Sequence, residues 1–154
     1  MPATSPIVRP TIAADYEAWL PMWQAYCRFY AVDVSAEVTD CTWRRIVARD
    51  SPVGGLMAVE ALTGAALGFA NYLVHPHTWS ERAACYLEDL FVCAERRGAG
   101  VGRALIDTLL GLGKDHGWSY LYWMTQEQNI VARRLYDRFT RRDDFVRYVV
   151  PIEG

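Results

Sequence analysis

Three glycines at alternate positions, Gly98, Gly100 and Gly102, are the residues whose spacing most directly suggests chemistry. Without Cβ atoms, such a loop can turn successive backbone N–H groups into one concavity that suits a diphosphate. A helix beginning directly after the loop adds unpaired amides and the positive end of its dipole. Positive charge comes from three flanking arginines, namely Arg96, Arg97 and Arg103. The pattern predicts a site for the diphosphate of a cofactor.

Two other kinds of phosphate-binding loop do not fit this segment. A Walker loop needs Lys followed by Ser or Thr after its last glycine, whereas Arg103-Ala104 follows here. A dinucleotide fold places Gly-x-Gly-x-x-Gly after the first strand of a parallel array. This loop instead comes late in the chain, after a segment expected to be antiparallel.

The residues around the loop predict the elements that must position it. Apolar side chains at three- and four-residue spacing predict a helix from Asp15, kinked or split at Pro21, and a second helix from the N-cap Ser35 to about Ala48. Further helices are expected from Val101 to the stop at Gly117, and from the cap Asn129 through Phe139. Strands are expected at 56–60, 67–74, 86–92, 120–124 and 145–150, with a loop at 75–82. This order predicts one α/β domain over residues 1–154, with helices on both faces of a mixed sheet.

Composition excludes several function classes. The net charge of −2 and the pI near 5.9 give no basic excess, so nucleic acid is not expected as a partner. No apolar run reaches the roughly 20 residues of a membrane span, and the opening Met-Pro-Ala-Thr-Ser-Pro does not resemble a signal peptide, so we expect a soluble, cytoplasmic protein without membrane partners. The four cysteines are widely spaced, and His75 and His77 lack a third ligand nearby, so no metal is expected.

Three motifs, together with the opening of the chain, resemble a known family. Residues 97–105 (RGAGVGRAL) are similar to the acetyl-CoA pyrophosphate loop of the GNAT acetyltransferases, whose pattern is Arg/Gln-x-x-Gly-x-Gly/Ala. Residues 86–92 (YLEDLFV) resemble the fourth strand of the branch that contains spermidine/spermine acetyltransferases and the histone/polyamine acetyltransferase-like proteins. Residues 129–136 (NIVARRLY) resemble the last conserved helix, and Val8 to Thr11 with Asp15 resemble the first strand and helix. Three motifs in order are far more specific than one.

The resemblance implies a GNAT fold, in which a mixed, mostly antiparallel sheet splays between strands 4 and 5. Acetyl-CoA would enter this splay as cosubstrate, and no metal would take part. The implied cofactor-binding residues are Leu90, Phe91, Val92, Arg97, Gly98, Ala99, Gly100, Val101, Gly102, Arg103 and Asn129. For the strand residues the backbone would make the contact, and Asn129 fits a helix N-cap equally well.

The resemblance also implies two catalytic residues. Strand alternation before any bulge puts Glu88 on the same side as Leu90 and Val92, beside the acetyl group, where Glu88 would be the general base. An ordinary Glu, with a pKa near 4.3, accepts a proton poorly from an ammonium group with a pKa near 10, so Glu88 would require burial or a water relay. Asp89 or a water chain could be the base instead. Tyr136 would donate a proton to the departing CoA thiolate; the alternative is a core aromatic next to Leu135.

The expected function is transfer of acetyl from acetyl-CoA to a primary amine of a small molecule, by direct attack in a ternary complex. Acidic and aromatic residues in the variable segments suit a polyamine or lysine-like amine, and Arg28 or Arg82 could hold an amino acid carboxylate. The residues concerned are Tyr26, Tyr30, Asp33, His75, Trp79 and Glu81. The alternatives are a protein-lysine acetyltransferase and a non-catalytic acetyl-CoA-binding sensor. By resemblance, a homodimer through residues 145–152 is expected.

Two features depart from the expected pattern. The aromatic-Gly pair that often follows the last helix of the family is replaced by Phe139-Thr140, so the final hairpin is expected to differ. Gly111 and Gly113 lie inside the helix after the glycine loop, where each costs up to about 1 kcal/mol relative to Ala.

Overall fold

The computed structural model describes residues 5–154, which form two compact units, one up to Met124 and one over residues 125–154. Met1 to Thr4, where the sequence predicted no signal peptide, lie outside the described residues. Each unit is described by itself below. The single domain over residues 1–154 therefore stays a prediction.

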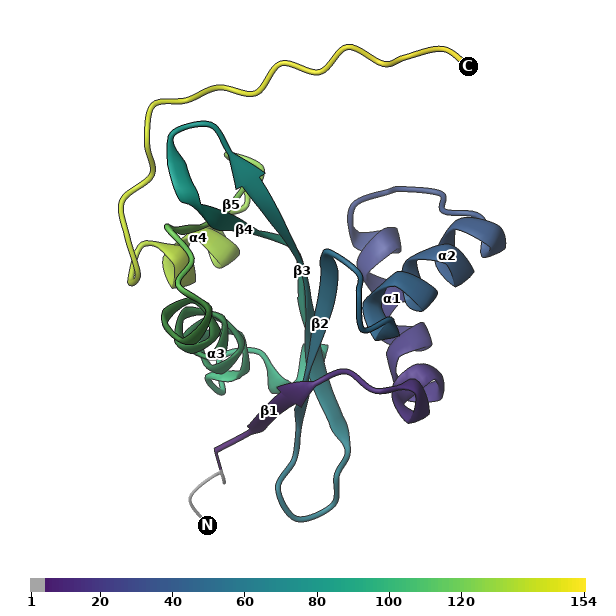
Figure 1. Ribbon diagram of the computed structural model, residues 1–154. Helices are drawn as coiled ribbons and strands as arrows, with labels where there is room; N and C mark the ends of the chain where they lie inside the picture. The colour runs from purple at the N-terminus through teal and green to yellow at the C-terminus, as the bar shows by residue number, and fades with distance from the viewer. Residues whose placement is uncertain (1–4) are drawn as a thin grey trace. The chain divides into compact units, whose positions relative to one another are not determined.

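The first unit is built on a five-stranded sheet (Figure 1). Its strands lie side by side in chain order: β1 (Ile7–Pro10), β2 (Val53–Val59), β3 (Ala66–His77), β4 (Ser80–Val92) and β5 (Leu121–Trp123). All neighbours are antiparallel except β4 and β5, which are parallel because a helix connects them. The predicted α/β class with a mixed, mostly antiparallel sheet is confirmed.

Helices cover both faces of this sheet (Figure 1). Helices α1 (Tyr16–Phe29) and α2 (Ala36–Val47) lie on one face, and α3 (Val101–His116) packs on the other. Two short 3-10 turns, η1 (Ala13–Asp15) and η2 (Ala94–Arg96), precede α1 and the glycine loop. On the α1 side the core is aromatic, with the rings of Trp19 and Trp23 stacked at 5.3 Å and both in contact with Phe69. On the α3 side it is aliphatic, with Leu105, Ile106 and Leu109 fully buried.

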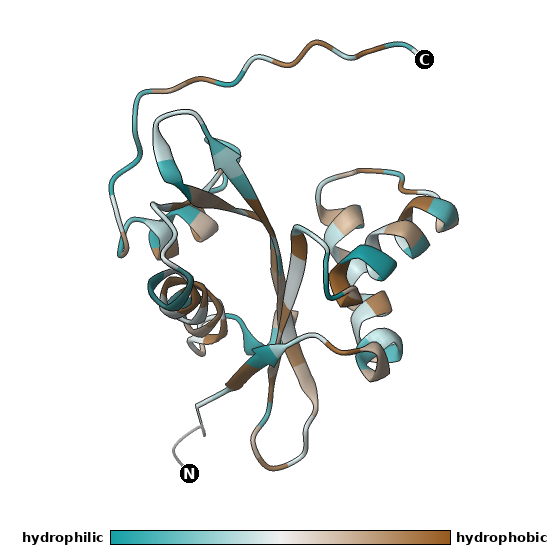
Figure 2. Ribbon diagram, in the orientation of Figure 1, coloured by the Kyte–Doolittle hydropathy of each residue, from teal (hydrophilic) through white to brown (hydrophobic). Residues whose placement is uncertain are grey.

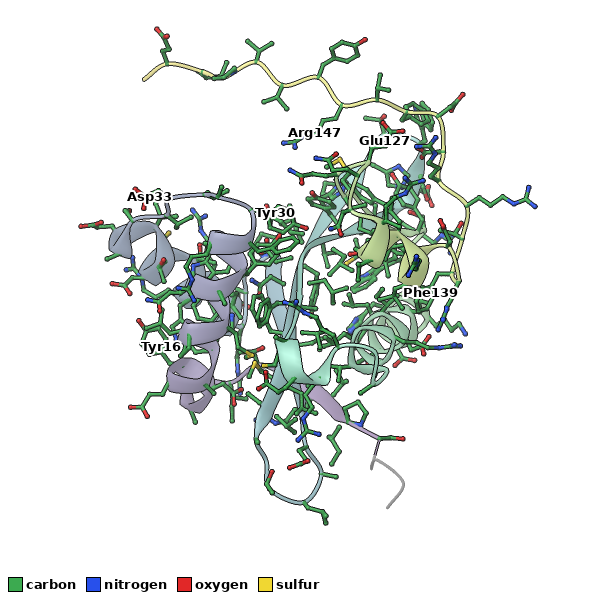
Figure 3. The ribbon with its side chains drawn as sticks, turned by 180° about the vertical axis from the view of Figure 1, so that it is seen from behind. Tyr16, Tyr30, Asp33, Glu127, Phe139 and Arg147 are labelled. Atoms are coloured by element: carbon green, nitrogen blue, oxygen red, sulfur yellow. The ribbon has the colours of Figure 1, made fainter. Side chains whose placement is uncertain are left out.

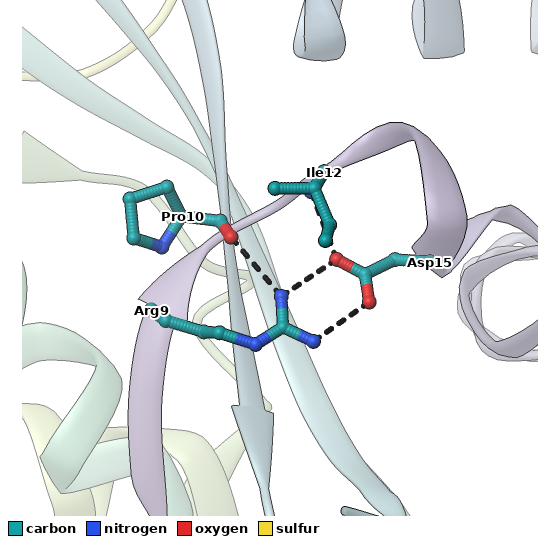
Figure 4. Close-up of polar contacts among 4 residues, drawn as sticks. All are labelled: Arg9, Pro10, Ile12 and Asp15. Carbon is teal, nitrogen blue, oxygen red and sulfur yellow. Dashed lines mark hydrogen bonds and ion pairs between the residues drawn. The ribbon is translucent and has the colours of Figure 1, made fainter.

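A partly buried ion pair connects β1 to the start of α1 (Figure 4). Both guanidinium nitrogens of Arg9 donate to the Asp15 carboxylate at 2.8 Å, and the backbone N–H of Ile12 donates to the same carboxylate at 2.8 Å. Arg9 also donates to the carbonyl of Pro10. The Arg9 hydrogen bond is the main cause that holds the pKa of Asp15 below its usual value. This contact fixes where α1 starts relative to the sheet.

Several predicted helix boundaries are confirmed. Ser35 caps α2, since its hydroxyl accepts from the N–H of Val38 at 3.2 Å. Gly117 ends α3 in the left-handed conformation. Pro21 lies inside α1 without splitting it. Gly113 now has a structural explanation, because a Cβ there would come within 3.2 Å of Trp118, whereas nothing in the structure explains Gly111.

Two sequence predictions in this unit are wrong. The expected loop at 75–82 is a tight turn, because β3 continues to His77 and β4 begins at Ser80. His75, Pro76 and His77 did not look like strand residues in the sequence. Backbone pairing nevertheless extends β3 to His77, and both histidine rings make hydrogen bonds there. The apolar spacing that predicted α2 also predicted that Val38 would make core contacts, but its side chain is 53% exposed.

The second unit contains one helix, α4 (Ile130–Tyr136). Asn129 caps it as predicted, accepting from the N–H of Ala132 at 3.4 Å, but the helix stops before Phe139. Residues 141–154 form neither helix nor strand, so the predicted closing strand at 145–150 is wrong. Its β-branched residues suit a strand, but a strand forms only where a neighbour completes its hydrogen bonds.

Hydropathy adds one finding on membranes. Among residues 5–154, none of the helices has the length and apolar character that crossing a membrane requires.

Candidate functional site

The glycine loop has the backbone geometry that the sequence predicted. Gly98 and Gly100 have φ angles of 80° and 83°, in the left-handed region that side chains disfavour, and Gly100 is the N-cap of α3. The N–H of Ala104 donates to the carbonyl of Gly100 at 3.0 Å, which is the first bond of the helix. The amides of Gly100, Val101 and Gly102 therefore precede the helical hydrogen-bond ladder and are available to an anion.

The arginines around the loop have different roles. Arg96 is ion-paired with Glu60 at 3.0 Å, and Glu60 also accepts from the hydroxyl of Thr63, so this arginine ties the loop to the β2–β3 turn. Arg97 is exposed and donates to the carbonyl of Val92 at 3.4 Å. Arg103 is exposed too and lies 3.5 Å from Asp107 in the next turn of α3. Arg97 and Arg103 thus present their charges beside the loop, while Arg96 supports it.

Strand β4 has an open edge beside this loop. Its pairing with β5 covers only Cys85 to Leu87, whereas β4 remains paired with β3 as far as Val92. The predicted cofactor contacts Leu90, Phe91 and Val92 lie in the part of β4 that is not paired with β5. Backbone groups on that edge can bind an extended chain such as pantetheine.

A β-bulge interrupts β4 at Glu88. Asn71 of β3 pairs with Asp89, but the next residue, Tyr72, pairs with Leu87, so Glu88 is the extra residue. The simple alternation that put Glu88 on one side with Leu90 and Val92 is therefore wrong. The bulge turns Asp89 to the α1 side of the sheet together with Asn71, and Glu88 is exposed.

Asp89 lies in a polar cluster under α1. The amide nitrogen of Asn71 donates to its carboxylate at 3.1 Å, and a hydrogen bond with Tyr26 also stabilises the charged form. Burial outweighs these bonds and raises the pKa of Asp89 to about 6, with a smaller contribution from the nearby Glu88. A carboxyl group with this pKa can bind and release protons close to neutral pH.

The sequence analysis missed Asn71. It is only 3% exposed, and no motif contains it, although an Asn in the middle of an apolar strand is an unusual choice. A buried amide of this kind needs hydrogen-bond partners, and here it finds the Asp89 carboxylate.

Tyr26 and Tyr30 meet at the C-terminal end of α1. Their rings lie 5.0 Å apart, and the Tyr26 hydroxyl is 3.5 Å from the backbone carbonyl of Glu88. Tyr30 ends this helix, and Asp33 lies in the loop that follows (Figure 3). Trp79 is at the turn between β3 and β4 and is 89% exposed. Of the predicted acceptor residues, the tyrosines are therefore the ones brought next to the bulge.

Two predicted site residues belong to the second unit. Tyr136 is the last residue of α4 and is partly buried. Asn129 uses both ends of its side chain locally: the carbonyl caps α4, and the nitrogen donates to the Thr125 hydroxyl at 3.2 Å. Within residues 5–154, no group of three or more His, Cys, Asp or Glu side chains is arranged to hold a metal ion.

Comparison with known proteins shows the family of the chain and finds solved structures with a similar fold. The profile described as the acetyltransferase (GNAT) family matches residues 17–140. The D-amino-acid N-acetyltransferase HPA3 of Saccharomyces cerevisiae is 32% identical over 142 residues, which cover 92% of this chain and 88% of that protein. A crystal structure of a probable acetyltransferase has a TM-score of 0.85 at 19% identity, over 96% of this chain and 99% of that one. The structure of AAC(6')-Iy with a bisubstrate analogue built on CoA has a TM-score of 0.82 at 17% identity, over 97% and 99%.

Proposed function

Because the chain belongs to the acetyltransferase (GNAT) family and is an acyl-CoA-dependent N-acetyltransferase, we propose that it transfers acetyl from acetyl-CoA to a primary amine of a small molecule. The acceptor is of the polyamine or amino acid type, and the amine attacks the thioester directly in a ternary complex. The named relative acts on D-amino acids, which supports the amino acid type. Membership of the spermidine/spermine and histone/polyamine branch, and a cytoplasmic location, stay predictions from the sequence.

The observation that carries this proposal is the glycine loop at the start of α3 beside the open edge of β4. The amides of Gly100, Val101 and Gly102 and the charges of Arg97 and Arg103 would hold the diphosphate of acetyl-CoA, whereas the Ala99 amide donates to the carbonyl of Arg96. The backbone of Leu90 to Val92 would hold the pantetheine arm. Asn129, as its resemblance to the family implies, would add a contact to the arm.

The base is proposed to be Asp89, with Glu88 as the second candidate. The sequence named Glu88 first, but the bulge leaves Glu88 exposed, whereas Asp89 is held by Asn71 and Tyr26. An acceptor ammonium has an ordinary pKa near 10, so transfer of its proton to a carboxylate with a pKa of about 6, directly or through a water, is uphill. Burial of Asp89 narrows that gap by about two pKa units relative to an ordinary aspartate.

Tyr136 is proposed as the proton donor to the departing CoA thiolate. This role rests on the match of residues 129–136 to the last helix of the family. A phenol titrates near 10 and a thiol near 8.5, so complete transfer is uphill by about 2 kcal/mol and a hydrogen bond to the thiolate suffices. Tyr136→Phe should keep acetyl-CoA binding and slow turnover.

We further propose a homodimer that uses residues 145–152. This segment exposes several large apolar side chains, and its ribbon has brown, hydrophobic stretches in Figure 2. They are Phe145 at 79%, Tyr148 at 89%, Val150 at 80% and Ile152 at 90% exposure. Light scattering should give twice the 17.5 kDa mass of the chain, and Val150→Asp should halve it. A monomeric wild type would refute the dimer.

Acetyl-CoA-dependent thiol release against a panel of acceptors tests the proposed function. The panel contains polyamines, D- and L-amino acids and a lysine peptide, with a control that lacks amine. Turnover of a free amine supports the proposal, and turnover of the peptide alone would make the chain a protein-lysine acetyltransferase. Saturable acetyl-CoA binding without turnover of any acceptor would favour the sensor.

A further inference from the structure

Five aromatic side chains form a connected cluster on the outer part of the sheet. The rings of Tyr86 on β4 and Tyr122 on β5, which are paired residues, stack at 4.9 Å with 23° between their planes. The Tyr122 ring also contacts the rings of Tyr120 at 5.6 Å and His75 at 5.8 Å, and His77 contacts Tyr120 at 5.1 Å. We call these residues the tyrosine–histidine cluster. The general acetyltransfer chemistry described above has no use for them.

His75 fixes the orientation of Tyr122. Its Nδ1 lies 2.8 Å from the carbonyl of Pro76, and its Nε2 lies 2.8 Å from the Tyr122 hydroxyl. A carbonyl only accepts, so Nδ1 carries a proton, and in the neutral ring Nε2 accepts from the tyrosine hydroxyl. Tyr122 is thereby held with its ring stacked on Tyr86.

The cluster shares a sheet face with Asp89. Asn71, Leu73 and His75 alternate along β3 and lie on one face; Asn71 pairs with Asp89, and Leu73 pairs with Tyr86. Two residues of a strand span about 6.6 Å, so the backbone positions of Tyr86 and Asp89 are roughly that far apart along the strands. An amine joined to a ring by on the order of two or three carbons spans this separation.

The cluster is only partly covered within the first unit. Tyr86, Tyr122 and His75 are partly buried, and Tyr120 is 48% exposed. Helix α1 contacts β3 and β4, and its Tyr26 packs on Phe69, while α3 lies on the opposite face. The rings are therefore not simply the centre of the core. They extend outward from the partly buried carboxylate of Asp89, which suits an ammonium group.

We propose that the tyrosine–histidine cluster binds the ring of an acceptor whose ammonium group lies at Asp89, so that the preferred acceptor is an aromatic primary amine. This inference rests on the proposed function and names its substrate class. Stacked or edge-on aromatic pairs contribute about 0.5–1.5 kcal/mol beyond their buried area. Converted at 1.4 kcal/mol per tenfold, this is about a two- to twelvefold preference over a saturated ring of the same size.

The experiment compares two matched pairs of acceptors: phenylalanine with cyclohexylalanine, each as D and L forms, and phenethylamine with cyclohexylethylamine. Each pair has the same carbon skeleton, but only one member has a flat aromatic ring. We expect kcat/KM to favour the aromatic member about fivefold in the wild type. Equal kcat/KM values for the two members of a pair, with rapid turnover of both, would overturn the proposal.

Two variants at one position identify the source of the preference. Tyr122→Leu keeps apolar bulk without a ring and should bring the ratio close to one, whereas Tyr122→Phe keeps the ring and should stay within about twofold of wild type. Thermal melts confirm that both variants fold. An unchanged ratio in Tyr122→Leu contradicts the assignment. A changed oligomeric mass with an unchanged ratio would make the cluster a contact between copies of the chain.

Binding separates this inference from the proposed function. Calorimetric titration of the wild type with phenethylamine and cyclohexylethylamine, in the presence of saturating CoA, measures the ring preference without turnover. An aromatic preference in binding with no acetylation would support the cluster and refute the proposed reaction. Acetylation of other amines with no aromatic preference in either assay would do the reverse.

Discussion

Two aspartates on the first unit show how differently one side chain is used. At the start of α1, Asp15 accepts two 2.8 Å hydrogen bonds from Arg9, and its pKa is lowered. At the bulge of β4, Asp89 meets the amide of Asn71 and the phenol of Tyr26, and burial raises its pKa to about 6. The charge of the partner decides the difference, because a guanidinium stabilises the carboxylate more than neutral donors do. Asp15 thus serves the fold, whereas Asp89 is suited to proton exchange.

The largest effect should come from Asp89→Asn. Without a carboxylate to accept a proton, kcat/KM should fall at least 100-fold, as is typical for the loss of a general base. Acetyl-CoA binding, measured by calorimetry, should be unchanged because the glycine loop is not altered. Glu88→Gln is the matched control and should lose less than about threefold. A larger loss in Glu88→Gln than in Asp89→Asn would reverse the assignment of the base.

Asp15→Asn should act on stability rather than on catalysis. Removing one partner of a fully buried pair costs 3–5 kcal/mol, but the Arg9 side chain is 36% exposed, so we expect the free energy of unfolding to fall by about 2 kcal/mol. Because the folded pKa is lowered, this contribution is present above the unfolded pKa and is lost as the pH falls through the folded value. Urea unfolding at pH 7 measures the loss in the free energy of unfolding, and a second measurement at pH 3 tests whether that loss disappears. The exposed Asp50→Asn should change little, and a comparable loss there would remove the special role of the pair.

The pH dependence of activity sharpens the comparison further. If Asp89 accepts the proton, kcat/KM should fall about tenfold for each pH unit below about 6. Asp15 stays ionised throughout this range, so Asp15→Asn should keep the inflection. The residual activity of Asp89→Asn should lack it. An inflection that survives in Asp89→Asn would assign the titration to another group.

The smallest effect is a gain in stability from Asp89→Asn. A raised pKa means that the folded state holds the Asp89 proton more tightly, so ionisation destabilises the fold as the pH rises from about 4 to about 6. Asparagine removes that cost, and we expect the variant to be more stable than wild type by about 1 kcal/mol at pH 7.5. The gain should vanish near pH 4. Equal stability at both pH values would mean that the carboxylate is better solvated than its burial suggests.

The two units differed in how far the sequence predicted them. In the first unit, turn and cap residues act locally, so the positions of Gly98, Ser35 and Gly117 sufficed to place the loop and the helix ends. In the segment after α4, the β-branched residues at 145–150 suggested a strand that did not form. Local conformation follows from local residues, whereas a strand depends on a partner that the sequence does not name.

The sequence by itself determined the class of the sheet, the position of the glycine loop and the membership of an acetyltransferase family, because glycine spacing and apolar periodicity act over a few residues. It did not determine which carboxylate turns to the α1 face of the sheet. That was decided by one extra residue in β4, since a bulge reverses which side chains point to which face. Asn71 and Asp89 lie far apart in the sequence, as do His75 and Tyr122. Each pair comes into contact only because the strands pair in the tertiary structure.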